Sequence, residues 1–170
     1  KRLFSDALWV ELVKPGFTLA SVVRTRMGDR SYPMIFLENH GIFVGSDSIE
    51  GIEGIYDHVM TTIEGALVRK PDFRAVAYDA LAVDSITTAL EGAIGQKVLF
   101  ETNAEVRSFL ANANSFGPVA SSFTPDHIVY AGFKPLWVGE GENLLDAYHA
   151  FEKEHGSAAK IIAVEGLGFF

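Results

Sequence analysis

The alternation of apolar and polar residues along the chain predicts strands and helices that follow one another from end to end. Apolar residues that recur every three or four positions indicate amphipathic helices, and short apolar runs bounded by Gly, Pro or charged residues indicate strands. We expect helices over 18–27, 49–67, 86–94, 106–113 and 143–154. Strands are expected over 8–12, 34–44, 97–100, 128–130, 135–138 and 161–164. Such alternation is typical of an α/β fold with parallel pairing.

Two helix starts carry a recognisable capping pattern. Asp47 with Glu50, and Thr102 with Glu105, have the spacing at which two side chains satisfy free backbone N–H groups at a helix N-terminus. Residues 112–122, by contrast, are rich in Asn, Ser and Gly and contain a proline. They are predicted to form a loop.

The stretch Met34–Gly45, MIFLENHGIFVG, is the most informative part of this pattern. An apolar run that should form a strand is interrupted by Asn39, His40 and Gly41 and then resumes. Burying an unpaired imidazole costs a few kcal/mol, so His40 must be hydrogen-bonded or used. Gly41 lets the backbone turn or bulge, which would present the His40 ring at a strand end. His40 is therefore either a hydrogen-bonded turn residue or a metal ligand, because neutral imidazole is a common ligand.

Three further side chains are candidates for a functional site. Asp126 and His127 precede a predicted strand, and Asp126 could orient or charge the ring. It could equally cap a turn after Pro125 while His127 fills surface. Glu38 lies two residues before His40, so on a strand both side chains would share a face. We treat Asp126 and His127 as candidate catalytic residues, and Glu38 as a candidate additional metal ligand that could instead hold the imidazole tautomer.

The segment Lys70-Pro71-Asp72 interrupts the pattern and predicts a boundary between two parts of the chain. Residues 1–71 form the first part, and residues 72–170 form a small α/β subdomain with a mostly parallel sheet. No internal repeat is apparent. Gly166-x-Gly168 is half of a dinucleotide-binding pattern, which is too little to predict NAD binding. The chain starts without Met and ends on two aromatic residues, so we expect a piece of a larger polypeptide.

The segment Asn39-His40-Gly41 resembles the Asn-His-Gly signature of the class II aldolase/adducin family. Other segments resemble the same family in the same order along the chain: Pro15–Ala20, Ser46–Glu50, Thr124–Ile128 and Lys134–Val138. The last two are similar to long family members in which an aldolase-type domain precedes a short-chain dehydrogenase. The resemblance implies that residues 1–71 are the C-terminal portion of a class II aldolase-like three-layer domain, with a dehydrogenase domain C-terminal to this piece.

In that family three histidines hold a divalent metal, usually zinc, and a glutamate is the acid/base. His40 is the one ligand that corresponds residue by residue. The other two belong to a His-x-His pair, which this chain lacks. We expect that pair, the catalytic glutamate and the phosphate-binding loops upstream of residue 1, so the 170-residue piece alone should be inactive.

The resemblance implies part of a metal-dependent aldehyde-lyase domain that acts on a sugar phosphate or a similar hydroxy-carbonyl substrate. It also implies a homo-oligomer, commonly a tetramer in the family. A non-catalytic adducin-like module for binding or assembly is the alternative. A third hypothesis is a stand-alone α/β domain that binds a small molecule.

Composition narrows the class of protein further. The chain has 170 residues, a formal net charge of −8 and no cysteine. The acidic balance argues against a nucleic-acid surface, and the absence of cysteine excludes a disulfide framework and a thiolate metal site. There is no basic run for a membrane surface, no apolar run long enough to span a bilayer and no signal-peptide segment in residues 1–20. We expect a cytoplasmic protein.

Overall fold

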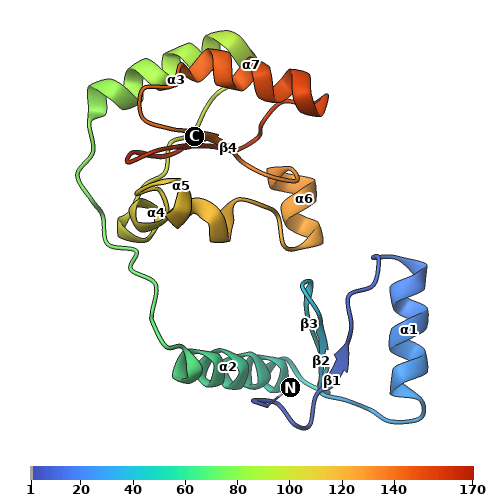
Figure 1. The fold of residues 1–170 in the computed structure, drawn as a ribbon. Helices are drawn as coiled ribbons and strands as arrows, with labels where there is room; N and C mark the ends of the chain where they lie inside the picture. The colour runs from blue at the N-terminus through green and yellow to red at the C-terminus, as the bar shows by residue number, and fades with distance from the viewer. Residues whose placement is uncertain (1) are drawn as a thin grey trace. The chain divides into compact units, whose positions relative to one another are not determined.

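The computed structural model describes residues 2–170, and the chain divides into two compact units (Figure 1). The first unit ends at Lys70 and the second begins at Pro71, within the segment where the sequence pattern breaks. Each unit contains one three-stranded sheet. The fold is therefore mixed α/β, with a separate core in each unit.

The sheet of the first unit is built around strand β2. Strand β1 (Leu8–Val10) pairs in parallel with β2 (Met34–Leu37), and β2 pairs antiparallel with β3 (Gly41–Val44). The helix α1 (Phe17–Met27) connects β1 to β2, and α2 (Ile49–Ala66) follows β3. The expected single strand over residues 34–44 is thus a hairpin, because the chain reverses at the Asn-His-Gly segment.

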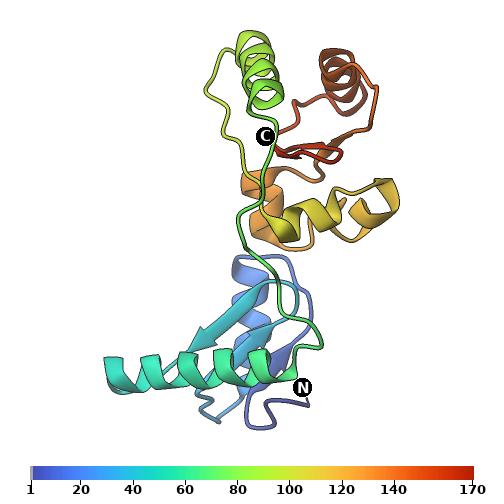
Figure 2. The same cartoon turned by 90° about the vertical axis from the view of Figure 1, so that its left-hand side faces the viewer.

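A helix covers each face of this sheet, so the first unit has three layers (Figure 2). Leu19 of α1 packs with Val10 and Leu37 on one face. Val59 of α2 packs with Phe4 and Met34 on the other. The predicted helices over 18–27 and 49–67 are confirmed by α1 and α2.

The start of α2 differs from its prediction by one residue. Ser48, not Asp47, is the capping residue, and its hydroxyl accepts a hydrogen bond of 3.1 Å from the backbone N–H of Gly51. The two residues are neighbours with short polar side chains of similar capping strength, so the sequence pattern alone did not distinguish them.

The second unit contains nine elements. They are α3 (Ala80–Ile94), α4 (Ala104–Phe109), α5 (Ala113–Phe116), the 3-10 helix η1 (Gly117–Val119), α6 (Pro125–Ala131), β4 (Leu136–Val138), α7 (Leu144–His155), β5 (Ile162–Val164) and β6 (Gly168–Phe169). Strand β4 pairs in parallel with β5, and β5 pairs antiparallel with β6. The expected mostly parallel sheet is therefore a mixed one, since the chain again reverses in a tight turn after its second strand.

Helices also cover both faces of the second sheet. Buried residues of α3 and α7, among them Leu90 and Phe151, pack with Leu136, Val138 and Ile162. On the other face, Leu110 and Phe116 pack against Ala163, with the Trp137 ring 4.8 Å from that of Phe116. Asn143 caps α7, and Gly95 and Gly156 end α3 and α7 in the left-handed conformation.

Three predictions in the second unit are wrong. Residues 97–100 are not a strand, because β6 is only two residues long and its contact with this segment is a single bridge between Glu101 and Phe169. The expected strand over 128–130 is helix α6, which begins after the Thr124 cap with proline in its first turn. The expected loop over 112–122 contains α5 and η1. Asn112 accepts hydrogen bonds from the backbone N–H and hydroxyl of Ser115.

The predicted cap at Thr102 is also displaced by one residue. Asn103 caps α4 by accepting a hydrogen bond from the backbone N–H of Val106. The Thr102 hydroxyl instead donates to the carbonyl oxygen of Leu167, 65 residues further along the chain. A long-range contact of this kind cannot be read from local spacing.

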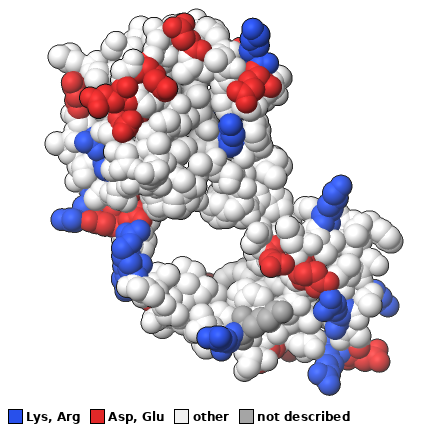
Figure 3. Space-filling model, in the orientation of Figure 1, with Lys and Arg blue, Asp and Glu red and all other residues white. Residues whose placement is uncertain are grey.

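The acidic charge is concentrated in the second unit. Residues 71–170 contain thirteen Asp and Glu against six Lys and Arg, whereas residues 1–70 contain nine against eight. Acidic side chains accordingly spread over the visible face of the second unit (Figure 3). In the part of the chain that the structure describes, no helix has both the length and the apolar character needed to cross a membrane.

Candidate functional site

The Asn-His-Gly segment forms the turn between β2 and β3. The backbone N–H of His40 donates to the carbonyl oxygen of Leu37 at 3.1 Å. Asn39 has a φ of 53°, a left-handed conformation that Asn tolerates better than most residues. Gly41 has a φ of 156°, which side-chain-bearing residues rarely adopt. The turn thus presents the His40 ring at a strand end, as the sequence predicted.

Glu38 lies in the same turn and, unlike His40 within the described residues 2–170, forms a side-chain hydrogen bond to another segment. Its backbone N–H donates to the carbonyl oxygen of Val10, and its Oε2 accepts a hydrogen bond from the backbone N–H of Leu12, both at 2.9 Å. The carboxylate therefore continues the contact between β1 and β2 beyond the end of both strands. The expectation that Glu38 and His40 share a strand face is wrong, because both belong to the turn.

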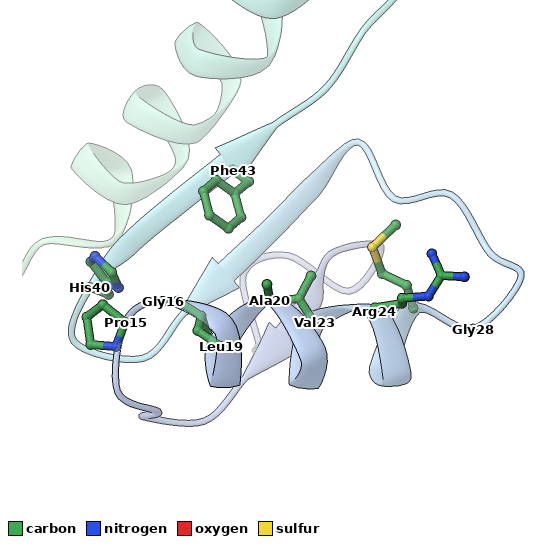
Figure 4. A pocket seen from close by; sticks show the side chains of 10 residues that line it. Pro15, Gly16, Leu19, Ala20, Val23, Arg24, Gly28, His40 and Phe43 are labelled. Carbon is green, nitrogen blue, oxygen red and sulfur yellow. The ribbon is translucent and has the colours of Figure 1, made fainter.

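His40 borders a cavity of about 690 Å³ between α1 and the hairpin (Figure 4). The cavity is lined by Pro15, Gly16, Leu19, Ala20, Val23, Arg24, Met27, Gly28, His40 and Phe43. His40 and Pro15 lie at one end, and Arg24 and Gly28 lie at the other. A mostly apolar cavity of this size with a few polar groups is typical of a site for a small molecule.

The imidazole of His40 is available to a ligand. The side chain is half-buried, and none of residues 2–170 hydrogen-bonds to its ring. The helix α1 starts at this end of the cavity, and its Gly16 cap provides no side-chain acceptor for the first backbone N–H groups. These N–H groups at one end of the cavity, and the Arg24 guanidinium at the other, each favour a negatively charged group on a bound molecule.

The sequence pattern missed Arg24 and Phe43 as parts of this site. Leu19, Val22, Val23 and Met27 recur at helical spacing on α1 and form the side that packs on the sheet. A second series, Leu19, Ala20, Val23, Arg24 and Met27, also recurs at helical spacing and lines the cavity. That second series was the signal from which the cavity wall could have been predicted.

Asp126 and His127 lie in the second unit, on the first turn of α6. Asp126 is exposed, whereas His127 is half-buried and touches the Phe123 ring edge-on at 4.3 Å. The Nδ1 atom of His127 is enclosed and has no hydrogen-bond partner within residues 2–170. His127 borders a separate cavity of about 240 Å³. The structure does not bring this pair together with His40 in one unit.

The donor set around His40 does not by itself fit a zinc site. A catalytic zinc normally has three protein ligands. Within residues 2–170, no three His, Asp or Glu side chains converge in a way that could hold a metal ion. Glu38 borders a different hollow, of about 380 Å³, with Glu11, Arg26 and Asn39. At this cavity the described residues thus offer one imidazole, that of His40.

Two side chains of the second unit, Tyr148 and Arg74, have a pKa above the ordinary value of their group. Burial, and to a lesser extent the charge of Glu152, raises the pKa of the Tyr148 hydroxyl. The hydrogen-bonded Asp72 carboxylate raises the pKa of the Arg74 guanidinium.

The chain matches no family model, no curated protein and no solved structure.

Proposed function

We propose that the first unit belongs to a metal-dependent, class II aldolase-like lyase domain in which His40 is one ligand of a divalent ion, with zinc as the expected metal. The observation that carries the proposal is the availability of the His40 ring at the mouth of a cavity of about 690 Å³. The ring is half-buried, and none of residues 2–170 hydrogen-bonds to it.

The remaining ligands would come from outside the described residues. One imidazole does not hold zinc tightly, because affinity depends on several ligands that are positioned and deprotonated together. A preceding stretch of polypeptide or a second copy of the chain could complete the set. This requirement agrees with the proposed homo-oligomer, in which a site could form where subunits meet.

The proposed substrate is a sugar phosphate or a related hydroxy-carbonyl compound. Arg24 lines the same cavity as His40 and is a suitable partner for a phosphate or carboxylate, which guanidinium binds through paired N–H groups. The apolar wall formed by Leu19, Val23 and Phe43 would exclude water from the body of the substrate.

A non-catalytic, adducin-like module for assembly is the second candidate function. Helix α2 favours it, because apolar side chains form a row along its exposed surface: Ile49, Tyr56, Met60 and Ile63, with Leu67 just beyond the helix end. Such a row is typical of a helix that packs against a partner. The proposed dehydrogenase neighbour and the cytoplasmic location stay predictions.

Metal analysis of purified protein tests the leading proposal. The 170-residue chain should retain little metal, whereas a longer chain that includes the preceding coding sequence should bind about one divalent ion per subunit. His40→Ala should remove that ion. His58→Ala is the matched control, since His58 lies in the same unit on α2 and contacts the Phe4 ring edge-on at 5.9 Å.

Two outcomes would contradict the ligand assignment. Unchanged metal content after His40→Ala would show that His40 is not a ligand. Tight one-to-one metal in the 170-residue chain would show that other residues of this chain complete a site. If the longer chain binds no metal and assembles through α2, the adducin-like function is favoured instead.

A further inference from the structure

The two units contain the same order of elements around their sheets. In the first, β1 leads through α1 to the parallel strand β2, and a tight turn leads to the antiparallel strand β3. In the second, β4 leads through α7 to the parallel strand β5, and a tight turn leads to β6. The parallel registers also correspond, with Leu8 opposite Ile35 and Leu136 opposite Ile162.

The sequences of these elements agree where the structures correspond. The first strand reads Leu-Trp-Val in both units, at 8–10 and at 136–138. The hairpins read MIFLENHGIF at 34–43 and IIAVEGLGFF at 161–170, which share Ile, Glu, Gly and Phe at equivalent positions. The helices between these strands are not similar in sequence, which explains why no internal repeat is apparent along the chain.

The strongest agreement lies in the hydrogen bonds of the two turns. The backbone N–H of Glu38 donates to Val10, and that of Glu165 donates to Val138, both at 2.9 Å. The Glu38 carboxylate accepts from the N–H of Leu12, and the Glu165 carboxylate accepts from that of Glu140, again both at 2.9 Å. Each carboxylate thus ties its turn to the residue two positions beyond the first strand.

The backbone of the turns follows the same path. The N–H of His40 bonds to the Leu37 carbonyl at 3.1 Å, and the N–H of Leu167 bonds to the Val164 carbonyl at 3.0 Å. The residue before it is left-handed in each case, with a φ of 53° at Asn39 and 66° at Gly166. A strand–helix–strand unit followed by a hairpin is a common arrangement, but a shared side-chain bond at the same position is not required by it.

The turns differ in what they present. Leu167 occupies the place of His40 and packs against the core of the second unit. Its carbonyl oxygen accepts hydrogen bonds from Thr102 and Arg107, and the Gly166 N–H donates to the carbonyl oxygen of Leu110 at 2.7 Å. Residues 102–110 therefore cover the second turn. Within residues 2–170, no such hydrogen bond from a distant segment covers the first turn.

We infer that the second unit contains a second copy of the module that holds His40, that this copy has no imidazole, and that Glu38 and Glu165 are equivalent positioning residues. The role of Glu38 follows from its equivalent in the second copy, Glu165. A glutamate with the same two hydrogen bonds is present where there is no histidine to assist and no metal ligand to supply. Its role is to fasten the turn to the first strand, and Glu38 therefore positions His40 and is not itself a ligand.

Amide hydrogen exchange and the NMR signals of the histidine rings test this inference on the whole 170-residue chain. Glu38→Ala should speed exchange of the Leu12 amide about fivefold, the effect of losing one hydrogen bond, and should shift the His40 ring signals. Glu38→Gln keeps an acceptor oxygen and should restore both. Glu165→Ala should speed exchange of the Glu140 amide by a similar factor and leave the His40 signals unchanged.

The claim that Glu38 is not a metal ligand rests on the proposed function, and a separate measurement, the metal content of the longer chain, tests it. In the longer chain, Glu38→Gln should keep the divalent ion that His40→Ala removes. Equal loss of metal in the two variants would make Glu38 a ligand and overturn its positioning role. Unchanged exchange at Leu12 in Glu38→Ala, or at Glu140 in Glu165→Ala, would overturn the equivalence of the copies. These exchange results decide the inference even if the longer chain binds no metal.

Discussion

The turn at residues 38–40 and the turn at residues 165–167 have similar backbone hydrogen bonds and different surroundings. The first places a half-buried imidazole beside a cavity. The second places Leu167 against a core and is covered by hydrogen bonds from residues 102–110. The comparison shows that local sequence determines how the chain turns, whereas a distant segment determines whether the turn is accessible to a ligand.

The difference in side chain follows from the difference in cover. An imidazole at position 167 would place a polar ring against the apolar core of the second unit, and burying its polar atoms without a hydrogen-bond partner is costly. A leucine side chain has no polar atom that needs a hydrogen-bond partner, and its apolar contacts stabilise the folded state. In the open turn the imidazole can stay hydrated or bind a ligand, so a histidine there costs little stability.

The largest expected effect concerns the independence of the two cores. Leu90 is fully buried in the second unit, and Leu90→Ala should lower the stability of that unit by about 3 kcal/mol, the sum of lost transfer energy and the cavity left behind. The chain has two tryptophans, Trp9 in the first unit and Trp137 in the second. Urea unfolding followed by fluorescence in Trp9→Phe and Trp137→Phe backgrounds should show a shift at Trp137 alone. Equal shifts at both would mean that the units unfold as one.

A smaller effect separates the two glycines that follow the turns. A methyl group on Gly168 would lie 2.5 Å from Cε2 of Phe100 and 2.7 Å from the carbonyl oxygen of Glu101, whereas one on Gly41 would meet nothing within 4 Å. Gly168→Ala should therefore cost about 2 kcal/mol through steric overlap. Gly41→Ala should cost about 1 kcal/mol, through its backbone conformation alone. Thermal unfolding of both variants checks the order, and a larger cost at Gly41 would contradict the close packing at β6.

The smallest effect is a pH dependence confined to the second unit. Burial raises the pKa of Tyr148, so above about pH 10 the unfolded chain loses this proton before the folded chain does. The stabilisation from neutral Tyr148 is fully present below that pH and is lost as the pH rises. Urea midpoints followed at Trp137 should fall less steeply with alkaline pH in Tyr148→Phe. Tyr56→Phe, at a partly exposed site on α2, is the control, and identical slopes in the two variants would contradict the assignment.

The helices could be predicted where the apolar periodicity is continuous. Helices α1, α2 and α7 each have a continuous apolar stripe, and α7 also has an Asn143 cap and a terminal Gly156. Residues 128–130 misled the prediction because Ile-Val-Tyr has high strand propensity. The Thr124 cap and the following Pro125 outweighed that propensity and formed α6.

The candidate site could be predicted only in part. His40 was identified from the interruption of an apolar run, and the turn that presents it follows from Asn39 and Gly41. The role of Glu38 could not be predicted, because its partner Leu12 lies 26 residues earlier in the chain. The α1 wall of the cavity could have been predicted from its second helical series, but the contribution of Phe43 could not, because spacing along one helix does not specify which strand faces it.

The identical strands Leu8-Trp9-Val10 and Leu136-Trp137-Val138 have a consequence for refolding. Each must find its own parallel partner, β2 or β5, across a connection of similar length, and the two partners share an Ile at the equivalent position and are each followed by a Glu. A first strand that pairs with the wrong partner forms a plausible register and must dissociate before folding is completed. Kinetic traps of this kind are characteristic of chains with repeated modules. Folding of each unit in the order of synthesis avoids the exchange, because β1 and β2 are both made before β4 exists.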